Sequence, residues 1–267
     1  MTLFKLTAAT LTFAALLSPS IPANAETVLI TGANTGIGLE FATEYAAKSW
    51  TVIATHHRAE TPPELKQLAA QYRNVRVEKM DVSNKEDIDG LAARLKAVPI
   101  DVLINNAGVY SKSGAPKSQA FGSFDYALFD NIIAVNVRGP LMVMEAFVGN
   151  VKASKQKKFV SISSTVGSLV QPYPGTNAVF YRTSKAALNK EMQVIAEVLR
   201  PDGVSVVMIH PGQVRTERLI SLAPGVVTDK DYMDAPESVA QMISTIDKVT
   251  LADSGHFMRY DHTPLPW

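Results

Sequence analysis

The residues best suited to proton transfer are Tyr181 and Lys185, which lie four positions apart. Residues 181–200 have the pattern of a long helix, and side chains at this spacing lie on the same helix face. A tyrosine phenol ordinarily has a pKa of about 10, but a neighbouring ammonium group stabilises the phenolate and lowers that pKa. The pair therefore indicates a general acid/base that works near neutral pH. The same spacing is also typical of an ordinary pair on a helix surface.

A glycine-rich turn follows the first apolar run, Thr27–Thr31, and precedes a helical pattern. Glycine permits a tight turn and close backbone approach, and the N-terminus of the next helix offers N–H groups to a pyrophosphate. The position of the turn predicts nucleotide binding, with an ordinary strand–helix turn as the alternative. Its residues are Gly32, Ala33, Asn34, Thr35, Gly36, Ile37 and Gly38.

The second strand, expected at 51–55, is followed by His56, His57 and Arg58, with no acid before Glu60. An acid there would bind the 2′-hydroxyl of NAD, whereas a cation would accept the 2′-phosphate of NADP. His57 and Arg58 therefore favour NADP(H) over NAD(H), with a solvated loop tip as the alternative. Adjacent histidines point apart and no further ligand cluster accompanies them, so we expect no metal site.

The composition excludes several classes of chemistry. The 267 residues include 26 Lys and Arg against 25 Asp and Glu, a net charge of +1, and no Cys. This balance provides no basic field for nucleic acid. Without cysteine, the chain has no disulfides, no Cys-ligated zinc, no iron–sulfur clusters and no thiol catalysis. With 46% hydrophobic residues, it can form the core of a globular protein.

Residues 1–25 differ from the rest of the chain. Lys5 precedes the apolar run Leu6–Leu17, which is followed by two prolines and by Ala23-Asn24-Ala25. This order is typical of a secretory signal peptide cleaved after Ala25, and it predicts a periplasmic or extracellular protein. The run is short for a membrane span, which needs about 20 residues, so we expect no stable span. The alternatives are an uncleaved anchor, an amphipathic extension or a start codon assigned too far upstream, the last with a cytoplasmic location.

From residue 26 onward, apolar runs alternate with helical patterns. This alternation predicts an α/β fold, a single Rossmann-type doubly wound parallel sheet of about seven strands with helices on both faces. No linker or repeat divides residues 26–267, so we expect one domain. Ser83–Glu86 has the spacing of a capping box. Strands are expected at 27–31, 51–55, 75–82, 101–105, 159–163, 204–210 and 255–260, and helices at 37–48, 62–72, 84–97, 123–134, 137–154, 181–200 and 235–249.

Seven short motifs follow one another along the chain. They are Thr31–Gly38, Asp81-Val82, Asn105–Gly108, Asn136 with Gly139, Ser163-Ser164, Tyr181–Lys185, and Pro211-Gly212 with Thr216. In this order they resemble the short-chain dehydrogenases/reductases, which use a Rossmann sheet and a nicotinamide cofactor. The resemblance covers the chain from residue 26 to residue 267.

A narrower resemblance is to the C-factor and sniffer-type carbonyl reductase branch, whose members mostly reduce carbonyls with NADPH. It rests on Tyr181–Asn189 and on the ending Tyr260–Trp267. The branch usually has Gly where His262 stands, and often a Cys-Arg pair where His56-His57 stand. Arg58 would then have to replace the missing arginine.

The resemblance implies catalytic roles for residues near the long helix. Tyr181 would be the general acid/base, and Lys185 would tune its pKa and bind ribose. Asn136 would help to hold a water linked to Lys185 in a proton relay. Asn136 is followed by Gly139-Pro140, which also predicts a disturbed helix, because proline removes a backbone donor.

Ser164 would donate a hydrogen bond to the carbonyl oxygen of the substrate, as the second residue of the Ser163-Ser164 pair. Ser161, Ser163 and Thr165 are close enough to be alternatives. The longest irregular stretches, 109–122, 165–180 and 211–234, are expected at the ends of strands, where such folds bind substrates. Within them, Val170–Gly175 is expected to shape the substrate pocket, with a packed surface loop as the alternative. A partly apolar pocket is indicated by Gln171, Tyr173, Phe180, Val214 and residues 217–234.

The resemblance also implies further contacts with the cofactor. Asp81 and Val82 would meet the adenine. The adenosine side would be lined by Asn105, Ala107 and Gly108. The nicotinamide carboxamide would be held by Pro211, Gly212, Val214 and Thr216. His210, next to this last group, is expected to be a packed residue at the end of a strand.

These observations predict an NAD(P)-dependent oxidoreductase that uses NADPH to reduce a carbonyl to an alcohol. The expected partner is a small carbonyl or alcohol substrate, and the resemblance implies a homodimer or homotetramer. One alternative is a non-catalytic nucleotide-binding signalling protein on the same fold. Another is a related isomerase or epimerase.

Overall fold

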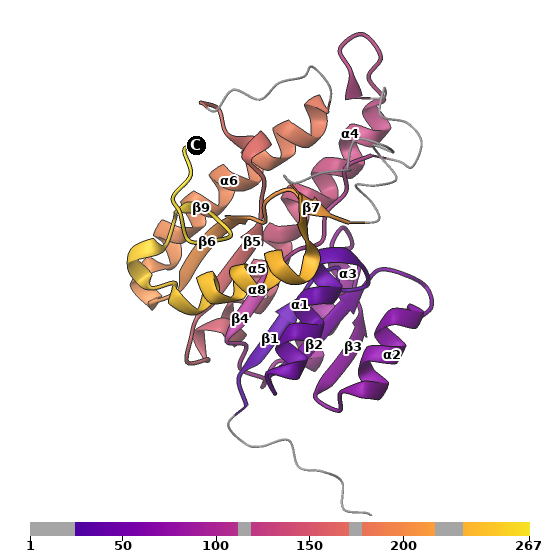
Figure 1. Cartoon of the computed structure of the whole chain (residues 1–267), viewed down its shortest axis with the longest axis vertical. Coiled ribbons are helices and arrows are strands. Elements are labelled where there is room, and N and C mark those ends of the chain that lie inside the picture. Colours follow the sequence, from indigo (N-terminus) through magenta and orange to yellow (C-terminus); the bar gives the residue numbers. More distant parts are fainter. Residues whose placement is uncertain (1–24, 112–118, 171–177, 217–231) are drawn as a thin grey trace, which may run out of the picture.

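A seven-stranded sheet lies at the centre of the structure, in the order β3-β2-β1-β4-β5-β6-β9 (Figure 1). The computed structural model describes residues 25–111, 119–170, 178–216 and 232–267. All neighbouring strands are parallel. The strands are β1 (Thr27–Ile30), β2 (Thr51–His56), β3 (Val75–Lys79), β4 (Val102–Asn105), β5 (Lys158–Ile162), β6 (Ser205–His210) and β9 (Phe257–Arg259). The predicted doubly wound parallel sheet is confirmed.

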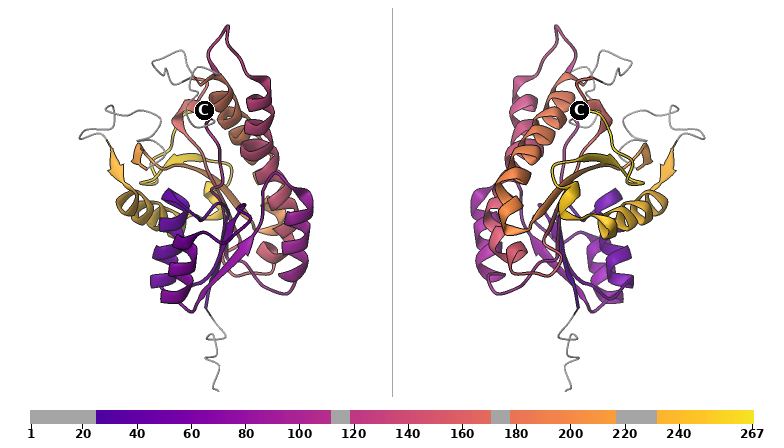
Figure 2. Two further views of the ribbon diagram at one scale, coloured as in Figure 1. Left: turned by 90° about the vertical axis from the view of Figure 1, so that its right-hand side faces the viewer. Right: turned by 90° about the vertical axis from the view of Figure 1, so that its left-hand side faces the viewer.

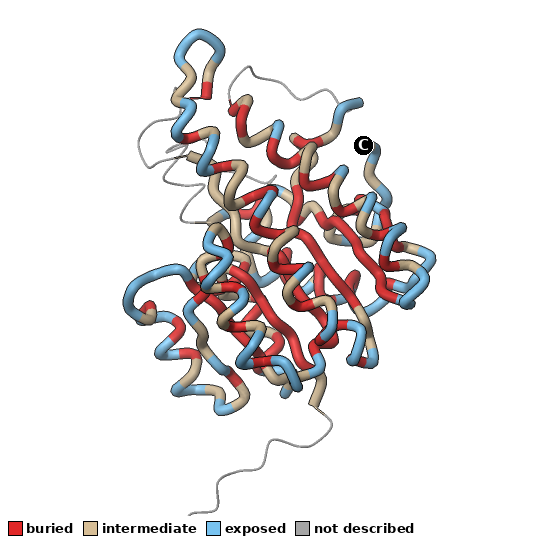
Figure 3. Tube along the Cα trace, turned by 180° about the vertical axis from the view of Figure 1, so that it is seen from behind, coloured by how far each residue is buried: buried red, intermediate tan, exposed pale blue. Residues whose placement is uncertain are grey.

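Helices cover both faces of this sheet (Figure 2). They are α1 (Gly36–Ala47), α2 (Pro63–Gln71), α3 (Lys85–Arg94), α4 (Tyr126–Ile133), α5 (Gly139–Lys152), α6 (Val179–Leu199) and α8 (Ala235–Lys248). One buried apolar cluster joins the sheet to α1, α2 and α8. The other joins it to α3, α5 and α6. Because both faces are covered, the central strands are buried along their length (Figure 3), which explains their continuous apolar runs.

The order of the strands determines where a ligand can bind. The chain proceeds outward from β1 to β2 and β3, and then returns to β4 on the other side of β1. The connections after β1 and β4 therefore lead in opposite directions, and in doubly wound sheets the ligand crevice lies at such a switch point, at the carboxyl ends of the strands. The glycine turn follows β1 directly, so it lies at this crevice.

The third strand and its following helix differ from the sequence prediction. β3 ends at Lys79 rather than at residue 82, because the chain turns at Asp81, whose carboxylate accepts hydrogen bonds from Ser83 N and Oγ. Ser83 is thus occupied, and Asn84 caps α3 by accepting from Glu86 N at 2.8 Å and Asp87 N at 3.1 Å. The predicted capping box at Ser83 is therefore wrong.

A π-helical turn, Ala134–Arg138, joins α4 to α5. Gly139 N donates to Ala134 O across this turn, and Pro140 has no N–H for the Asn136 carbonyl. The predicted disturbance of the helix is confirmed. Among the described residues, the continuous helical segment Tyr126–Lys152 is the one helix with the length and apolar composition to cross a membrane. Of its most apolar stretch of 18 residues, 44% is buried inside the fold. The buried residues of α5 pack in the core beside the sheet, and those of α4 pack with Phe180 of α6.

A second, small sheet lies outside the sequence prediction. β7 (Val214–Arg215) and β8 (Met233–Asp234) pair in parallel beyond the end of β6. The tail that follows β9 returns along this strand. Met258 of β9 pairs with Pro264 of the tail, and Trp267 stacks on Phe257 with ring centres 6.0 Å apart.

Candidate active site

Tyr181 and Lys185 lie on the first turns of α6, which packs against the sheet beside β6. The Lys185 Nζ atom is 5.7 Å from the centre of the Tyr181 ring. The same Nζ donates a 2.8 Å hydrogen bond to the carbonyl oxygen of Ile162, the last residue of β5. Lys185 is buried, so this bond helps to offset the cost of removing its ammonium from water. The ammonium is thereby held beside the phenol ring.

Asn136 connects the π-helical turn to α6 and to the loop after β4. Its Oδ1 accepts from Val109 N at 2.8 Å, and its Nδ2 donates to Val109 O at 2.8 Å. Nδ2 also donates to Ser184 Oγ at 3.0 Å, and Ser184 Oγ donates to Tyr181 O at 2.7 Å. A buried chain of hydrogen bonds therefore links Asn136 to the backbone of Tyr181.

Ser164 begins the 3₁₀ turn Thr165–Gly167 that follows β5, and its Oγ accepts from Val166 N at 3.4 Å. This turn packs closely on α6: a Cβ at Gly167 would lie 2.7 Å from the carbonyl carbon of Lys185. The glycine therefore allows Ser164 and the helix that carries Tyr181 to approach each other. Ser163 is not equivalent, because its Oγ donates to the buried Asn189.

The glycine turn has no space for side chains. Gly32 and Gly36 have φ of +64° and +54°, which is the left-handed region that favours glycine. A Cβ at Gly38 would lie 2.3 Å from Gly32 O and 2.4 Å from Asn106 Nδ2. Thr35, the N-cap of α1, makes no side-chain capping bond with the described residues. The helix N-terminus is thus presented beside a tight backbone cradle.

Thr31 and Asn106 hold this cradle against the end of β4. Thr31 Oγ1 accepts from Asn106 N and Ala107 N, each at 3.0 Å. Asn106 Nδ2 donates to the carbonyl oxygens of Thr31 and Gly32, each at 3.0 Å. Both residues belong to the motifs noted above, but their spacing gives no sign that they bind each other. Asn105 is buried, and its Nδ2 has no hydrogen-bond partner among the described residues.

The end of β2 separates the two histidines. His56 is buried, whereas His57 and Arg58 are exposed. Burial, followed by the neighbouring His57, lowers the pKa of His56, so its imidazole is held neutral. Lys79 is the residue of β3 paired with His56 and is exposed beside it. The cationic groups at this edge are therefore His57, Arg58 and Lys79, and Lys79 was missed because β3 was expected to continue past it.

The remaining predicted cofactor residues lie at two places around the crevice. Asp81 and Val82 follow β3, and the Val82 carbonyl would be 2.9 Å from a Cβ at Gly139 in the π-helical region. A Cβ at Gly36 would lie 3.4 Å from Thr216 Cγ2, so the segment after β6 closes over the glycine turn. Val214 is buried in β7, and Ser238 Oγ donates to Pro211 O at 2.6 Å. Gly212 has φ of +84° and leaves room for Tyr260.

His210 is the last residue of β6 and directly precedes Pro211. Burial, followed by the Arg259 cation, lowers the pKa of His210 to about 4, as expected for a packed residue.

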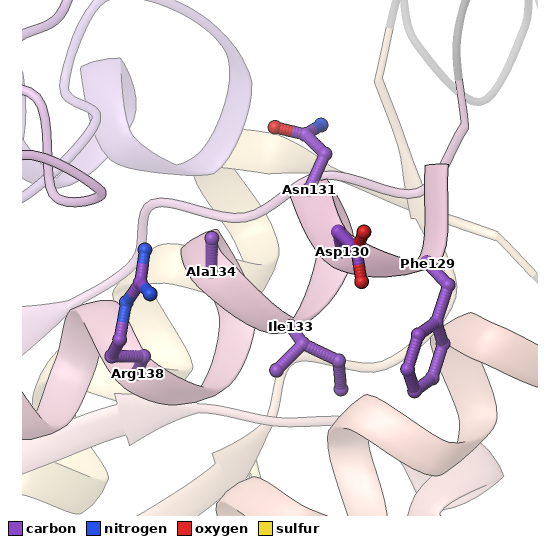
Figure 4. Close-up of a pocket in the computed structure, with 6 residues that line it drawn as sticks. All are labelled: Phe129, Asp130, Asn131, Ile133, Ala134 and Arg138. Atoms are coloured by element: carbon purple, nitrogen blue, oxygen red, sulfur yellow. The ribbon is translucent and has the colours of Figure 1, made fainter. Parts of the chain in front are cut away.

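A cavity of about 460 Å³ lies along α4 and the π-helical turn (Figure 4). It is lined by Phe129, Asp130, Asn131, Ile133, Ala134 and Arg138, and none of the predicted catalytic side chains borders it. Within the described ranges, no cluster of three His, Cys, Asp or Glu could hold a metal ion. Residues 171–175 and 217–231, expected to shape the substrate pocket, lie outside the described residues.

One residue near Tyr181 could not be predicted as part of the site from the sequence. Gln119 is fully buried, and its side chain reaches both the loop after β4 and the first turn of α6. It is a lone glutamine in an irregular stretch, without a motif or a periodic pattern around it.

Comparisons with known proteins find similar sequences and structures. A family model described as short chain dehydrogenase matches residues 26–225. The C-signal protein of Myxococcus xanthus is 37% identical over 169 residues, which cover 63% of this chain and 93% of that protein. The NADPH-bound carbonyl reductase from chicken fatty liver is similar with a TM-score of 0.81 and 30% identity, over 91% of this chain and 99% of that one. The carbonyl reductase Sniffer of D. melanogaster has a TM-score of 0.78 and 27% identity, over 91% and 100%.

Proposed function

The chain belongs to the short-chain dehydrogenase family, and we propose that it is an NADPH-dependent reductase that converts a carbonyl compound into an alcohol. The observation that carries the proposal is the position of the Lys185 ammonium, 5.7 Å from the centre of the Tyr181 ring. The similarity to an NADPH-bound carbonyl reductase supports the same activity.

The residues at the crevice fit a dinucleotide. A Cβ would fill the backbone cradle at Gly32 and Gly38, and the N-terminus of α1 suits the negative charge of a pyrophosphate. The Nδ2 of Asn105 is buried, has no hydrogen-bond partner among the described residues, and lies at the carboxyl end of β4, next to this cradle. NADPH supplies the hydride when it is bound. Gly32–Gly38 would hold its pyrophosphate, with Thr216 close to Gly36.

The selection of NADPH over NADH is proposed to depend on the exposed cations after β2. The cationic guanidinium of Arg58 can form charge-assisted hydrogen bonds with a 2′-phosphate. His57 stands beside it, and no carboxylate occurs between β2 and Glu60 to repel the phosphate.

The proton step uses residues of the chain alone. Tyr181 donates its phenolic proton to the carbonyl oxygen of the substrate as the hydride reaches the carbonyl carbon. The Lys185 ammonium stabilises the phenolate that remains. Ser164 donates a hydrogen bond to the same carbonyl oxygen and orients it. Asn136 holds the backbone beneath Tyr181 through Ser184, and its carbonyl, which has no donor from Pro140, can accept from a water of the relay.

The test is reduction of a panel of aldehydes, ketones and quinones by the purified protein, followed as oxidation of NADPH. Tyr181→Phe should lower kcat at least about 100-fold, since it removes the general acid, while NADPH binding is retained. Tyr126→Phe, at an exposed tyrosine of α4, is the matched control and should leave kcat unchanged. A wild-type protein that binds NADPH but reduces nothing in the panel would contradict the proposal.

A second candidate is a nucleotide-binding signalling protein without an essential reaction. The 37% identity with C-signal favours it. The two functions differ in one respect that can be measured: a phenotype of the gene deletion that is fully restored by the Tyr181→Phe protein would support signalling without catalysis.

We also propose that residues 1–25 are a cleaved export signal and that the mature protein is a homodimer or homotetramer. N-terminal sequencing of the protein from fractionated cells tests the first statement, with residue 26 expected as the new N-terminus outside the cytoplasm. Light scattering of the purified protein tests the second.

A further inference from the structure

Gln119 forms a bridge between two segments of the site. Its Oε1 accepts a 3.0 Å hydrogen bond from Tyr181 N, and its Nε2 donates to Tyr110 O. The side chain is fully buried, so both of its polar ends are used where water cannot replace a lost partner. One end of the amide can only accept and the other can only donate. The two bonds therefore define a single orientation of the amide.

The bond to Tyr181 N supplies a cap that α6 does not have locally. The first N–H groups of a helix lack partners within the helix, and Tyr181 is the third residue of α6. The N-cap is Ala178, whose side chain has no acceptor and whose φ is +65°. The acceptor comes instead from Gln119, 62 positions away. The start of α6 is thus held by tertiary structure.

The hydrogen bond from Gln119 to Tyr110 O also helps to hold Tyr181, through the ring of Tyr110. The rings of Tyr110 and Tyr181 lie 4.9 Å apart, tilted by 59°. Gln119 therefore holds the backbone of Tyr181 directly, and it holds the residue whose ring packs against the Tyr181 ring. A phenol oxygen lies at the far end of a rigid side chain, so a small rotation of the first helical turn displaces it further than the backbone.

We propose that Gln119 is a positioning residue for proton transfer, which acts by holding the Tyr181 phenol beside the Lys185 ammonium. This inference rests on the proposed role of Tyr181. Displacements of about 1 Å can lower the rate of an enzymatic step about 100-fold. Loss of the bridge should accordingly act on the chemical step rather than on the binding of NADPH, because the hydrogen bonds of Gln119 reach Tyr110 and Tyr181 and neither the glycine turn nor residues 105–108.

The experiment compares the full-length wild-type protein with Gln119→Met, which has a similar shape and neither hydrogen bond. The matched control is Gln156→Met, because Gln156 bonds to Glu26 at the amino-terminal end of the strands, away from the site. We expect kcat of Gln119→Met to fall about 10- to 100-fold, with the dissociation constant of NADPH within about twofold of wild type. The pH at which alcohol oxidation is half-maximal should move upward, because a phenol displaced from Lys185 loses the stabilisation of its phenolate. The Gln156→Met control should change none of these values.

Gln119→Glu provides a conservative rescue. While the introduced carboxyl group is neutral, its carbonyl oxygen can accept from Tyr181 N and its O–H can donate to Tyr110 O. Once it is ionised, the carboxylate can only accept, and the second bond is lost. The ratio of the kcat of this variant to that of wild type should therefore rise toward one as the pH is lowered, whereas the ratio for Gln119→Met stays low.

The outcomes separate this inference from the proposed function. An inactive wild-type protein would contradict the proposed function. An active wild type together with wild-type kcat and pH profile in Gln119→Met would overturn the positioning role. The role would also be overturned if kcat, NADPH affinity and melting temperature all fell together with no shift of the pH profile, since that pattern describes a structural residue only.

Discussion

The side-chain amide of Asn136 pairs with both backbone polar groups of Val109, with one 2.8 Å hydrogen bond in each direction. The two residues are 27 positions apart and lie in the π-helical turn and in the loop after β4. This pairing joins the loop after β4 to the helical segment that contacts α6 through Ser184. It requires an amide, because one end must donate and the other must accept.

Asn136→Asp should therefore damage both stability and activity. An ionised carboxylate cannot donate to Val109 O or to Ser184 Oγ, and a buried unsatisfied group costs about 1–3 kcal/mol. Urea unfolding should show that loss, and kcat should fall with it. Asn150→Asp is the control, since Asn150 donates to Leu95 O and Val98 O at the far end of α5. It should lower stability similarly but leave kcat of the folded enzyme unchanged; an equal loss of kcat in both variants would count against a local role of Asn136.

Gly38→Ala should weaken the binding of NADPH. The added methyl group would lie 2.3 Å from Gly32 O and 2.4 Å from Asn106 Nδ2. These two atoms are hydrogen-bonded to each other, so the start of α1 would have to move away from the cradle. We expect at least a tenfold loss of NADPH affinity by fluorescence titration, on the order of 1.4 kcal/mol.

Gly149→Ala serves as the control for Gly38→Ala. Gly149 is also helical, and nothing lies within 4 Å of its Cβ position. Replacement should stabilise α5 by about 0.5–1 kcal/mol and leave NADPH affinity unchanged. Unaltered NADPH binding in Gly38→Ala would show that the tight turn does not hold the cofactor.

Arg58→Asp should reverse the preference between the two nicotinamide cofactors. The exchange removes a permanent cation and adds a carboxylate, which repels a 2′-phosphate and can accept from a 2′-hydroxyl. A charged hydrogen bond contributes about 1.5–3 kcal/mol, so kcat/KM for NADPH should fall by at least about tenfold while that for NADH rises. Arg73→Asp, at an exposed arginine between α2 and β3, is the control. An unchanged ratio in Arg58→Asp would place the selection elsewhere at this edge, for example at Lys79.

His210 should make the protein sensitive to acid. Burial and the Arg259 cation lower the pKa of His210 to about 4 in the folded state, whereas a histidine in the unfolded chain has a pKa of about 6.5. Between these values the unfolded state binds more protons, so the free energy of unfolding falls as the pH falls, by up to about 3 kcal/mol in total. His210→Asn should flatten this part of the stability profile in urea titrations, and the exposed His256→Asn should not. Equal slopes in all three proteins would exclude His210 as the cause.

Glu191 should change the pH dependence of the free energy of unfolding in the direction opposite to His210. Burial raises the pKa of Glu191 to about 7, and its Oε2 has no hydrogen-bond partner among the described residues. The unfolded carboxyl group ionises at a lower pH, so the free energy of unfolding falls as the pH rises from about 4.5 to about 7. Glu191→Gln should therefore be more stable than wild type above about pH 7, with a smaller difference near pH 4. Glu145→Gln, at an exposed position of α5, is the control. A difference that does not change with pH would contradict this account.

Much of the fold could be predicted because its signals are local. The apolar run at Thr27–Ile30 and the glycines after it specify a buried strand and a tight turn over a few residues. The errors were local too: Asn84 rather than Ser83 caps α3, because the Ser83 hydroxyl is engaged by Asp81. Such competition between neighbouring side chains is not visible in residue spacing.

The parts of the site that could not be predicted depend on contacts between distant segments. The two adjacent histidines are equivalent in the sequence, but His56 is covered by the fold and His57 is not. The pairing of β7 with β8 joins segments on either side of a long connection. Lys79 lies at the same edge as His57 and Arg58 only through its register with His56.

Residue order and spacing were enough to define the strands of the central sheet and the helices between them, the glycine turn and the shared helix face of Tyr181 and Lys185. These features follow from periodicity and backbone sterics over short distances. Only the folded chain brings Thr31 to Asn106 across 75 positions and Gln119 to the helix of Tyr181 across 62. Hydrogen-bond partners at such separations depend on which strands become neighbours in the sheet, and that order is a property of the packed core as a whole.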